Sequence, residues 1–113
     1  MYDYFARVTN VVDGDTFDAE VDLGFDVFKK TRFRLVGIDT PETWRPKSLA
    51  EKAHGKMATE FVKSLIEGKT VTIISTKIGA YNRYDAVVIL EDDSNLAELL
   101  KLNDFEKRSD YEV

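Results

Sequence analysis

The sequence predicts a small α+β fold, a five-stranded antiparallel β-barrel of the OB type closed over one helix. Three β-prone segments precede a helical segment, and two further strands and a short helix follow it. The chain of 113 residues has room for one domain. Hydrophobic residues make up 43% of the chain, enough for one core, and the absence of cysteine excludes disulfides, thiolate metal sites and cysteine nucleophiles.

The first three strands are predicted from residue type and from alternation at period two. Residues 3–12 are rich in β-prone side chains and run into an Asp-Gly-Asp turn. In residues 17–23 apolar side chains alternate with carboxylates, and in residues 30–36 basic side chains alternate with apolar ones. These two segments predict a hairpin. On its polar face we expect cross-strand pairing of Lys30 and Arg32 with Asp18, Glu20 and Asp22.

Residues 48–67 are predicted to form a helix because apolar side chains recur at spacings of three and four. Ser48 and Glu51 fit a capping box at its start, and Gly68 fits a left-handed cap at its end. Gly55 in the interior costs up to about 1 kcal/mol relative to alanine. The expected apolar face comprises Leu49, Ala50, Ala53, Met57, Ala58, Phe61, Val62, Leu65 and Ile66.

The rest of the chain predicts two strands, at 71–75 and 84–90, and a short helix near 95–102. We expect residues 1–102 to form the OB-fold domain and residues 103–113 to be an acidic, flexible tail. Residues 91–113 hold eight acidic and three basic residues, so the formal net charge of −5 lies there and the body of the chain is balanced. A balanced body does not repel a phosphate-rich partner.

No segment indicates a membrane span or a leader. The longest apolar run, residues 86–90, is far shorter than the roughly 18 residues that a span needs. The first residues lack the basic-then-apolar pattern of a signal peptide. We therefore expect a cytoplasmic protein.

Two acidic loops are candidates for metal binding. Asp15 follows the first strand and Asp39 and Glu42 follow the third, so the three carboxylates could converge. Such an oxygen-only set suits Ca²⁺ or Mg²⁺. The alternative is that each motif is only turn chemistry, which is the commoner reason for an aspartate in a turn.

Arg34 and Arg83 are candidates for phosphate binding because a guanidinium offers a planar, bidentate fork. The alternative for Arg34 is cross-strand pairing. Trp44, beside the acidic loop, could stack on a base or cover one end of the barrel. His54 is the one histidine, and without a Gly-x-Ser-x-Gly elbow it is assigned no catalytic role.

Three segments resemble the staphylococcal nuclease (thermonuclease) family, in matching order and spacing: residues 11–16 (VVDGDT), 34–43 (RLVGIDTPET) and 81–84 (YNRY). Residues 21–25 resemble short members found in bacteriophage genomes. The resemblance spans about residues 4–100. It implies an OB-fold, here without the family's third, C-terminal helix, and Ca²⁺-dependent hydrolysis of phosphodiester bonds in DNA and RNA.

The resemblance also implies roles for individual residues. Asp15 and Asp39 would bind Ca²⁺ through carboxylates and Thr40 through its carbonyl, Glu42 would hold or deprotonate the attacking water, Arg34 and Arg83 would bind the scissile phosphate, and Tyr81 and Trp44 would contact substrate. We expect a monomeric nuclease. The alternatives are a non-catalytic OB-fold module that binds nucleic acid, and a protein-interaction domain that uses the acidic tail.

Overall fold

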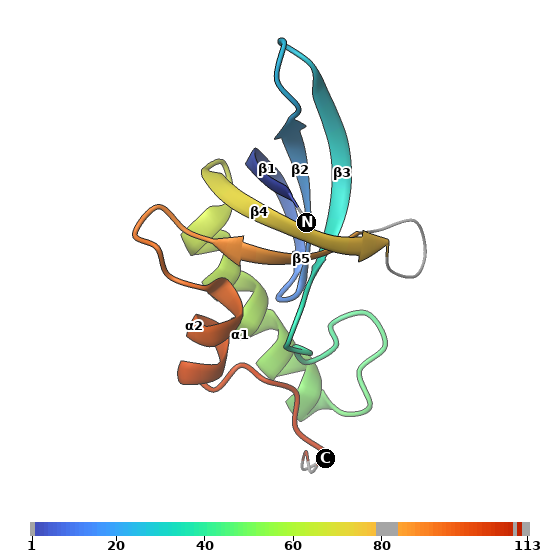
Figure 1. Ribbon diagram of the computed structural model, residues 1–113. Coiled ribbons are helices and arrows are strands. Elements are labelled where there is room, and N and C mark those ends of the chain that lie inside the picture. The colour runs from blue at the N-terminus through green and yellow to red at the C-terminus, as the bar shows by residue number, and fades with distance from the viewer. Residues whose placement is uncertain (1, 79–83, 110, 112–113) are drawn as a thin grey trace.

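The computed structural model describes residues 2–78, 84–109 and 111, which form a closed five-stranded barrel with two helices at one end (Figure 1). The predicted OB-type barrel is therefore confirmed. The elements in chain order are β1 (Tyr2–Asp13), β2 (Thr16–Asp22), β3 (Phe28–Leu35), α1 (Leu49–Ile66), β4 (Thr70–Ile78), β5 (Tyr84–Ile89) and α2 (Leu96–Leu102).

The barrel closes in the order β1-β2-β3-β5-β4, with β4 paired back to β1. Neighbouring strands are antiparallel except β3 and β5, which run parallel where Phe33 lies opposite Tyr84 and Leu35 opposite Ala86. The β2–β3 hairpin extends well beyond the barrel, on the side away from the helices (Figure 1).

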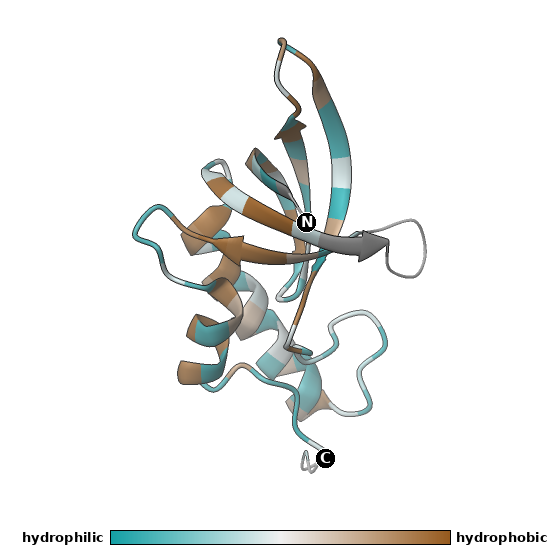
Figure 2. Cartoon of the chain, viewed as in Figure 1, coloured by the Kyte–Doolittle hydropathy of each residue, from teal (hydrophilic) through white to brown (hydrophobic). Residues whose placement is uncertain are grey.

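The core follows the period-two alternation of the strands. Figure 2 shows hydrophobic segments on β4, β5 and α1, whereas β3 and the loop that follows it are mainly hydrophilic. Inward-facing side chains of all five strands meet apolar residues of both helices. The largest fully buried apolar side chains of the core are Phe17, Leu35, Ile66, Ile73, Leu96 and Leu100. Neither described helix is both long and apolar enough to cross a membrane.

The polar face of the hairpin carries part of the expected ion pairing. Arg32 Nε lies 2.7 Å from Asp18 Oδ1, as predicted. Glu20 lies opposite Lys30 in the register, but its carboxylate pairs at 2.7 Å with Arg7 of β1. Closure of the barrel brings β1 beside β2, so Glu20 pairs with a basic residue of β1 and not with Lys30, the residue opposite it on β3.

The ends of α1 match the sequence signals. Ser48 Oγ accepts the Glu51 N–H at 3.1 Å, and Gly68 takes the left-handed conformation with φ of 77° just after the helix. The reciprocal half of the predicted capping box is absent here, because the Glu51 carboxylate instead accepts the backbone N–H groups of Glu42 and Lys47.

The buried face of α1 differs from the predicted one at its N-terminal half. Leu49 and Met57 are 79% and 61% exposed, and Ala53 is exposed as well, so the placement of these three residues on the buried face was wrong. The buried stripe instead comprises Glu51, Gly55, Ala58, Val62 and Ile66. Only the second half of the helix meets the hydrophobic core, because the first half packs against the polar backbone of the loop after β3.

Gly55 explains how that loop lies so close to the helix. A Cβ atom at this position would stand 2.7 Å from the Pro41 carbonyl oxygen and 3.0 Å from that of Glu42. Backbone carbonyls cannot move aside as a flexible side chain can. The helix therefore keeps a residue of poor helix propensity in order to admit the loop.

We predict that Gly55→Ala destabilises the protein by about 1–3 kcal/mol, because the overpacking outweighs the helix propensity gained by alanine. Urea unfolding followed by circular dichroism measures the change. The exposed Ala53 provides the matched control, since Ala53→Gly should cost only about 1 kcal/mol, from propensity alone. A gain in stability for Gly55→Ala would contradict the close packing.

Candidate functional site

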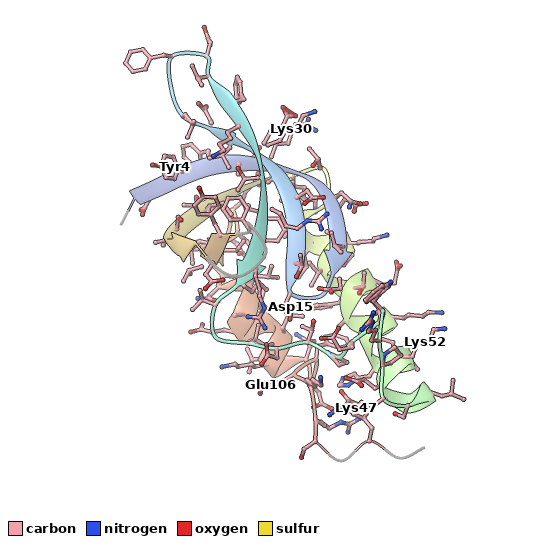
Figure 3. All side chains as sticks on the ribbon, turned by 90° about the vertical axis from the view of Figure 1, so that its right-hand side faces the viewer. Tyr4, Asp15, Lys30, Lys47, Lys52 and Glu106 are labelled. Atoms are coloured by element: carbon pink, nitrogen blue, oxygen red, sulfur yellow. The ribbon has the colours of Figure 1, made fainter. Side chains whose placement is uncertain are left out.

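The β1–β2 turn holds the first candidate carboxylate, Asp15, in a fixed orientation. The Asp15 N–H donates to Asp13 Oδ1 at 3.2 Å, and the Thr16 hydroxyl donates to Asp15 Oδ1 at 3.2 Å. The Asp15 side chain is mostly buried, with 13% of it exposed. In Figure 3, Asp15 lies toward the end of the molecule that carries Lys47 and Glu106, away from Lys30 on the hairpin.

The loop after β3 packs directly on this turn. A Cβ at Gly14 would stand 2.8 Å from Thr40 Cγ2, so only glycine allows Thr40 to sit there. The Thr40 N–H donates to Asp15 Oδ2 at 3.1 Å. Thr40 is buried, and its hydroxyl has no hydrogen-bond partner among the described residues. This contact brings Asp39 next to Asp15.

Arg34, the last outward-facing residue of β3, joins the two loops. Its Nη2 atom forms ion pairs with Asp15 Oδ2, at 3.6 Å, and with Asp39 Oδ1. Arg34 is half-buried, whereas Asp39 is exposed. The structure thus brings together Asp15, Arg34, Asp39 and Thr40, and it places Arg34 with the acidic loops instead of in a cross-strand pair.

Negative charge accumulates at the turn. Burial, a side-chain hydrogen bond with Asp15, and repulsion from the Asp15 and Glu42 carboxylates together raise the pKa of Asp13 to about 7. Glu42 is itself exposed. The negative charges of Glu42 and Asp15 therefore both act on Asp13. A cation bound at this turn would reduce the repulsion among the three carboxylates.

The donor set can be compared with what calcium requires. Asp15 and Asp39 contact the same Arg34 nitrogen, so both carboxylates reach one positively charged atom at once. Across the described residues, no three acidic or histidine side chains are arranged to hold a metal. Two carboxylates and a backbone carbonyl, such as that of Thr40, fit a hard cation that retains water or substrate oxygens as further ligands.

Three predicted site residues remain: Trp44, Tyr81 and Arg83. Trp44 is 78% exposed with the Arg45 guanidinium 4.5 Å from its ring centre, so it does not cover the end of the barrel. Tyr81 and Arg83 lie outside the described residues.

The structure adds a further acidic residue, Glu51, which the sequence indicates only as part of a helix cap. Glu51 is completely buried, and Lys107 Nζ lies 3.4 Å from its Oε2 atom. Hydrogen bonds from the Lys47 and Glu42 backbone, together with the Lys107 charge, lower the pKa of Glu51 despite its burial. The Ser-x-x-Glu motif predicted that the Glu51 N–H bonds to Ser48. It did not predict the bonds from the Glu51 carboxylate to the loop and to Lys107.

The segment after α2 lies against α1 and the acidic loop. The Lys107 N–H donates to the Asp39 carbonyl at 2.7 Å. His54 Nε2 contacts the Asp104 carbonyl at 2.6 Å, and its Nδ1 contacts the Tyr111 hydroxyl at 2.7 Å. Flexibility of this segment stays a prediction. Both ring nitrogens of His54 have partners, which agrees with its having been assigned no catalytic role.

A hollow of about 530 Å³ opens between this segment, the start of α1 and Asp39. Its lining combines acidic and basic side chains with one aromatic ring. The lining residues are Asp39, Lys47, Ser48, Glu51, Glu106, Lys107, Arg108, Ser109 and Tyr111.

Fold and geometry together define a class: a small OB-type barrel with two carboxylates and an arginine where the β1–β2 turn meets the loop after β3. A sequence model described as "Staphylococcal nuclease homologue" matches residues 32–102. The chain belongs to the staphylococcal nuclease family.

Relatives named as nucleases share this similarity. An "Uncharacterized endonuclease" of Escherichia coli O157:H7 is 34% identical over 98 residues, which cover 87% of this chain and 56% of that protein. "Endonuclease YhcR" of Bacillus subtilis (strain 168) is 35% identical over 107 residues, 88% of this chain and 8% of that protein. The "Thermonuclease" of Staphylococcus hyicus is 33% identical over 67 residues, 59% of this chain and 36% of that protein. The chain thus spans about half the length of the E. coli relative.

The raised pKa of Asp13 predicts a pH-dependent stability. Between the ordinary value of 3.8 and the folded value of about 7, the folded state binds a proton that the unfolded state lacks, so stability falls as pH rises through this window. Asp13→Asn removes this loss. In chelator we expect the variant to exceed wild type by about 1 kcal/mol or more at pH 8, with the difference shrinking toward pH 4.

Urea unfolding at the two pH values measures this difference. The exposed Asp3 provides the control, because Asp3→Asn makes the same chemical change at a position that is not buried. An equal effect of Asp13→Asn at both pH values would show that the Asp13 carboxyl does not titrate in this window.

Proposed function

We propose that this protein is a metal-dependent nuclease that hydrolyses phosphodiester bonds in DNA and RNA. The observation that carries the proposal is the meeting of Asp15, Asp39 and Arg34 at one end of the barrel. Acidic ligands and an arginine are what a reaction at a phosphate diester requires. A relative named "Uncharacterized endonuclease", similar over 87% of this chain, supports the same activity.

The arginine binds and stabilises the reacting phosphate. Arg34 is held at the site by Asp15 and Asp39, and a phosphate oxygen would compete with those carboxylates for its guanidinium fork. Charge that develops on the phosphoryl oxygens in the transition state would then face a preoriented cation. The family resemblance assigns Arg83 to the same phosphate.

Glu42 would accept a proton from the attacking water, which is the role that the family resemblance implies for it. It is exposed and lies close enough to the turn to raise the pKa of Asp13. Asp15, Asp39 and the Thr40 carbonyl would hold Ca²⁺. That ion, when bound, supplies positive charge that neutralises the phosphate and lowers the barrier to attack by water.

On the described part of the chain, two regions are candidates for contact with the substrate beyond the scissile phosphate. Trp44 is exposed beside the acidic loop and offers a face on which a base can stack. Lys47 and Arg108 line the hollow next to Asp39 and would face the phosphates that flank the scissile one.

The alternative function is a module that binds nucleic acid without cutting it. Binding alone needs basic and aromatic surface, and the hollow and Trp44 supply both. It does not need the carboxylates that surround Arg34. Their presence favours the enzyme.

We predict cleavage of single-stranded or duplex DNA that requires Ca²⁺ and stops in excess chelator. Asp39→Ala should weaken calcium binding and activity together, because it removes a charged ligand. Cleavage is followed on gels, and calcium binding by titration calorimetry. Full activity in chelator would overturn the metal dependence. Binding of DNA without cleavage under any metal would favour the alternative function.

We predict that Arg34→Ala lowers kcat by about 10² or more, equivalent to roughly 3 kcal/mol, with a smaller effect on substrate binding. Arg34→Lys should not restore the rate, since an ammonium cannot donate two parallel hydrogen bonds. Arg32 is the matched control, because it lies two residues away on the same strand face and pairs with Asp18. Arg32→Ala should leave kcat within about twofold of wild type. A similar loss in both variants would indicate a general charge effect.

A further inference from the structure

Glu51 is a completely buried carboxylate that the proposed mechanism does not use. Its Oε1 atom accepts the Lys47 N–H at 2.7 Å, and its Oε2 atom accepts the Glu42 N–H at 3.2 Å. Lys107 Nζ lies 3.4 Å from Oε2. Glu51 thus has partners in the loop that leads into its own helix and in the segment after α2.

The partners of Glu51 hold both ends of one loop and one segment beside it. The two backbone donors, Glu42 and Lys47, bracket the loop that carries Trp44. The lysine belongs to the segment after α2, and its own N–H donates to the Asp39 carbonyl at 2.7 Å. One buried charge therefore connects, directly or through Lys107, the backbone of Glu42 and of Asp39.

Core stability alone does not account for a charge at this position. Burying a carboxylate costs several kcal/mol, and an apolar residue of similar size is often as stabilising as a buried ion pair. An apolar residue would, however, accept no N–H from the loop. The carboxylate is therefore suited to fixing a polar backbone, which hydrophobic packing cannot do.

We propose that Glu51 is a positioning residue that orients the 42–47 loop, and with it Glu42, toward the candidate site. The inference rests on the proposed nuclease function for its catalytic consequence only. Lys107 acts with Glu51 by balancing its charge and by tying the C-terminal segment to Asp39. Neither residue touches the reacting phosphate in this role.

Glu51→Gln tests the proposal with little change in shape. A carboxylate accepts at both oxygens, but a glutamine amide has one acceptor oxygen and turns an NH₂ group toward the other N–H. One end of the loop must then lose its hydrogen bond. Glu60→Gln is the matched control, because Glu60 lies on the same helix, is exposed and undergoes the same change of charge.

Trp44 provides a readout that is independent of activity. It is the one tryptophan in the chain and lies within the loop, so its fluorescence anisotropy reports the motion of that loop. We expect Glu51→Gln to lower the anisotropy without substrate, and Glu60→Gln to leave it unchanged. Circular dichroism and the melting temperature establish that each variant is folded.

Kinetics provide the second readout. We expect Glu51→Gln to lower kcat about tenfold or more with KM within about threefold of wild type, because the loop bears the group that acts on water. Glu60→Gln should retain both constants. Lys107→Met should lower kcat less, by about three- to tenfold, and the exposed Lys101 supplies its control as Lys101→Met.

Each outcome decides the proposal. Unchanged anisotropy and kcat in folded Glu51→Gln would overturn it, as would an equal loss in Glu60→Gln. If Glu51→Gln does not fold, Lys107→Met decides: a lower kcat at native stability supports the proposal, and an unchanged one overturns it. If wild type cleaves nothing while Glu51→Gln frees Trp44, loop positioning is supported and the nuclease function is rejected.

Discussion

The functional end of this barrel depends on how closely the loop after β3 approaches its two neighbours. On one side Thr40 fits against the β1–β2 turn because Gly14 has no Cβ, and on the other Pro41 lies against α1 because Gly55 has none. The loop is thus held between a strand turn and a helix. This double contact sets the distance between carboxylates that are far apart in sequence, and the candidate site exists only while both contacts hold.

Charged groups at this end fall into two kinds, distinguished by their partners. Glu51 is fully buried yet has its pKa lowered, since two backbone N–H groups and a lysine stabilise its ionised form. Asp13 has its pKa raised, since burial and neighbouring carboxylates disfavour its ionised form. The ionised carboxylate is therefore stabilised at Glu51, under the loop, and destabilised at Asp13, in the turn. Frustrated negative charge is what a binding site for a cation requires, whereas the satisfied charge serves the architecture.

The segment after α2 extends the site beyond the barrel. Acidic composition predicted a flexible tail, yet Lys107 reaches both Glu51 and the Asp39 carbonyl, and His54 contacts Asp104 and Tyr111. A charge count over 23 residues does not show that one basic side chain, that of Lys107, pairs with the buried Glu51. Net charge describes how a segment interacts with solvent and at long range, but not which of its side chains are paired.

The sequence by itself determined the strands, both helices and the hairpin, because alternation, helical spacing and caps are properties of neighbouring residues. The sequence also indicated Asp15, Arg34 and Asp39 as site residues, because each lies at or just after the end of a predicted strand. It could not distinguish a capping glutamate from one that fixes a loop, nor did it show that Leu49 and Met57 face solvent. Those outcomes depend on which segments meet across the fold. Only the tertiary structure decides such contacts, because they result from close packing between residues that are distant in sequence.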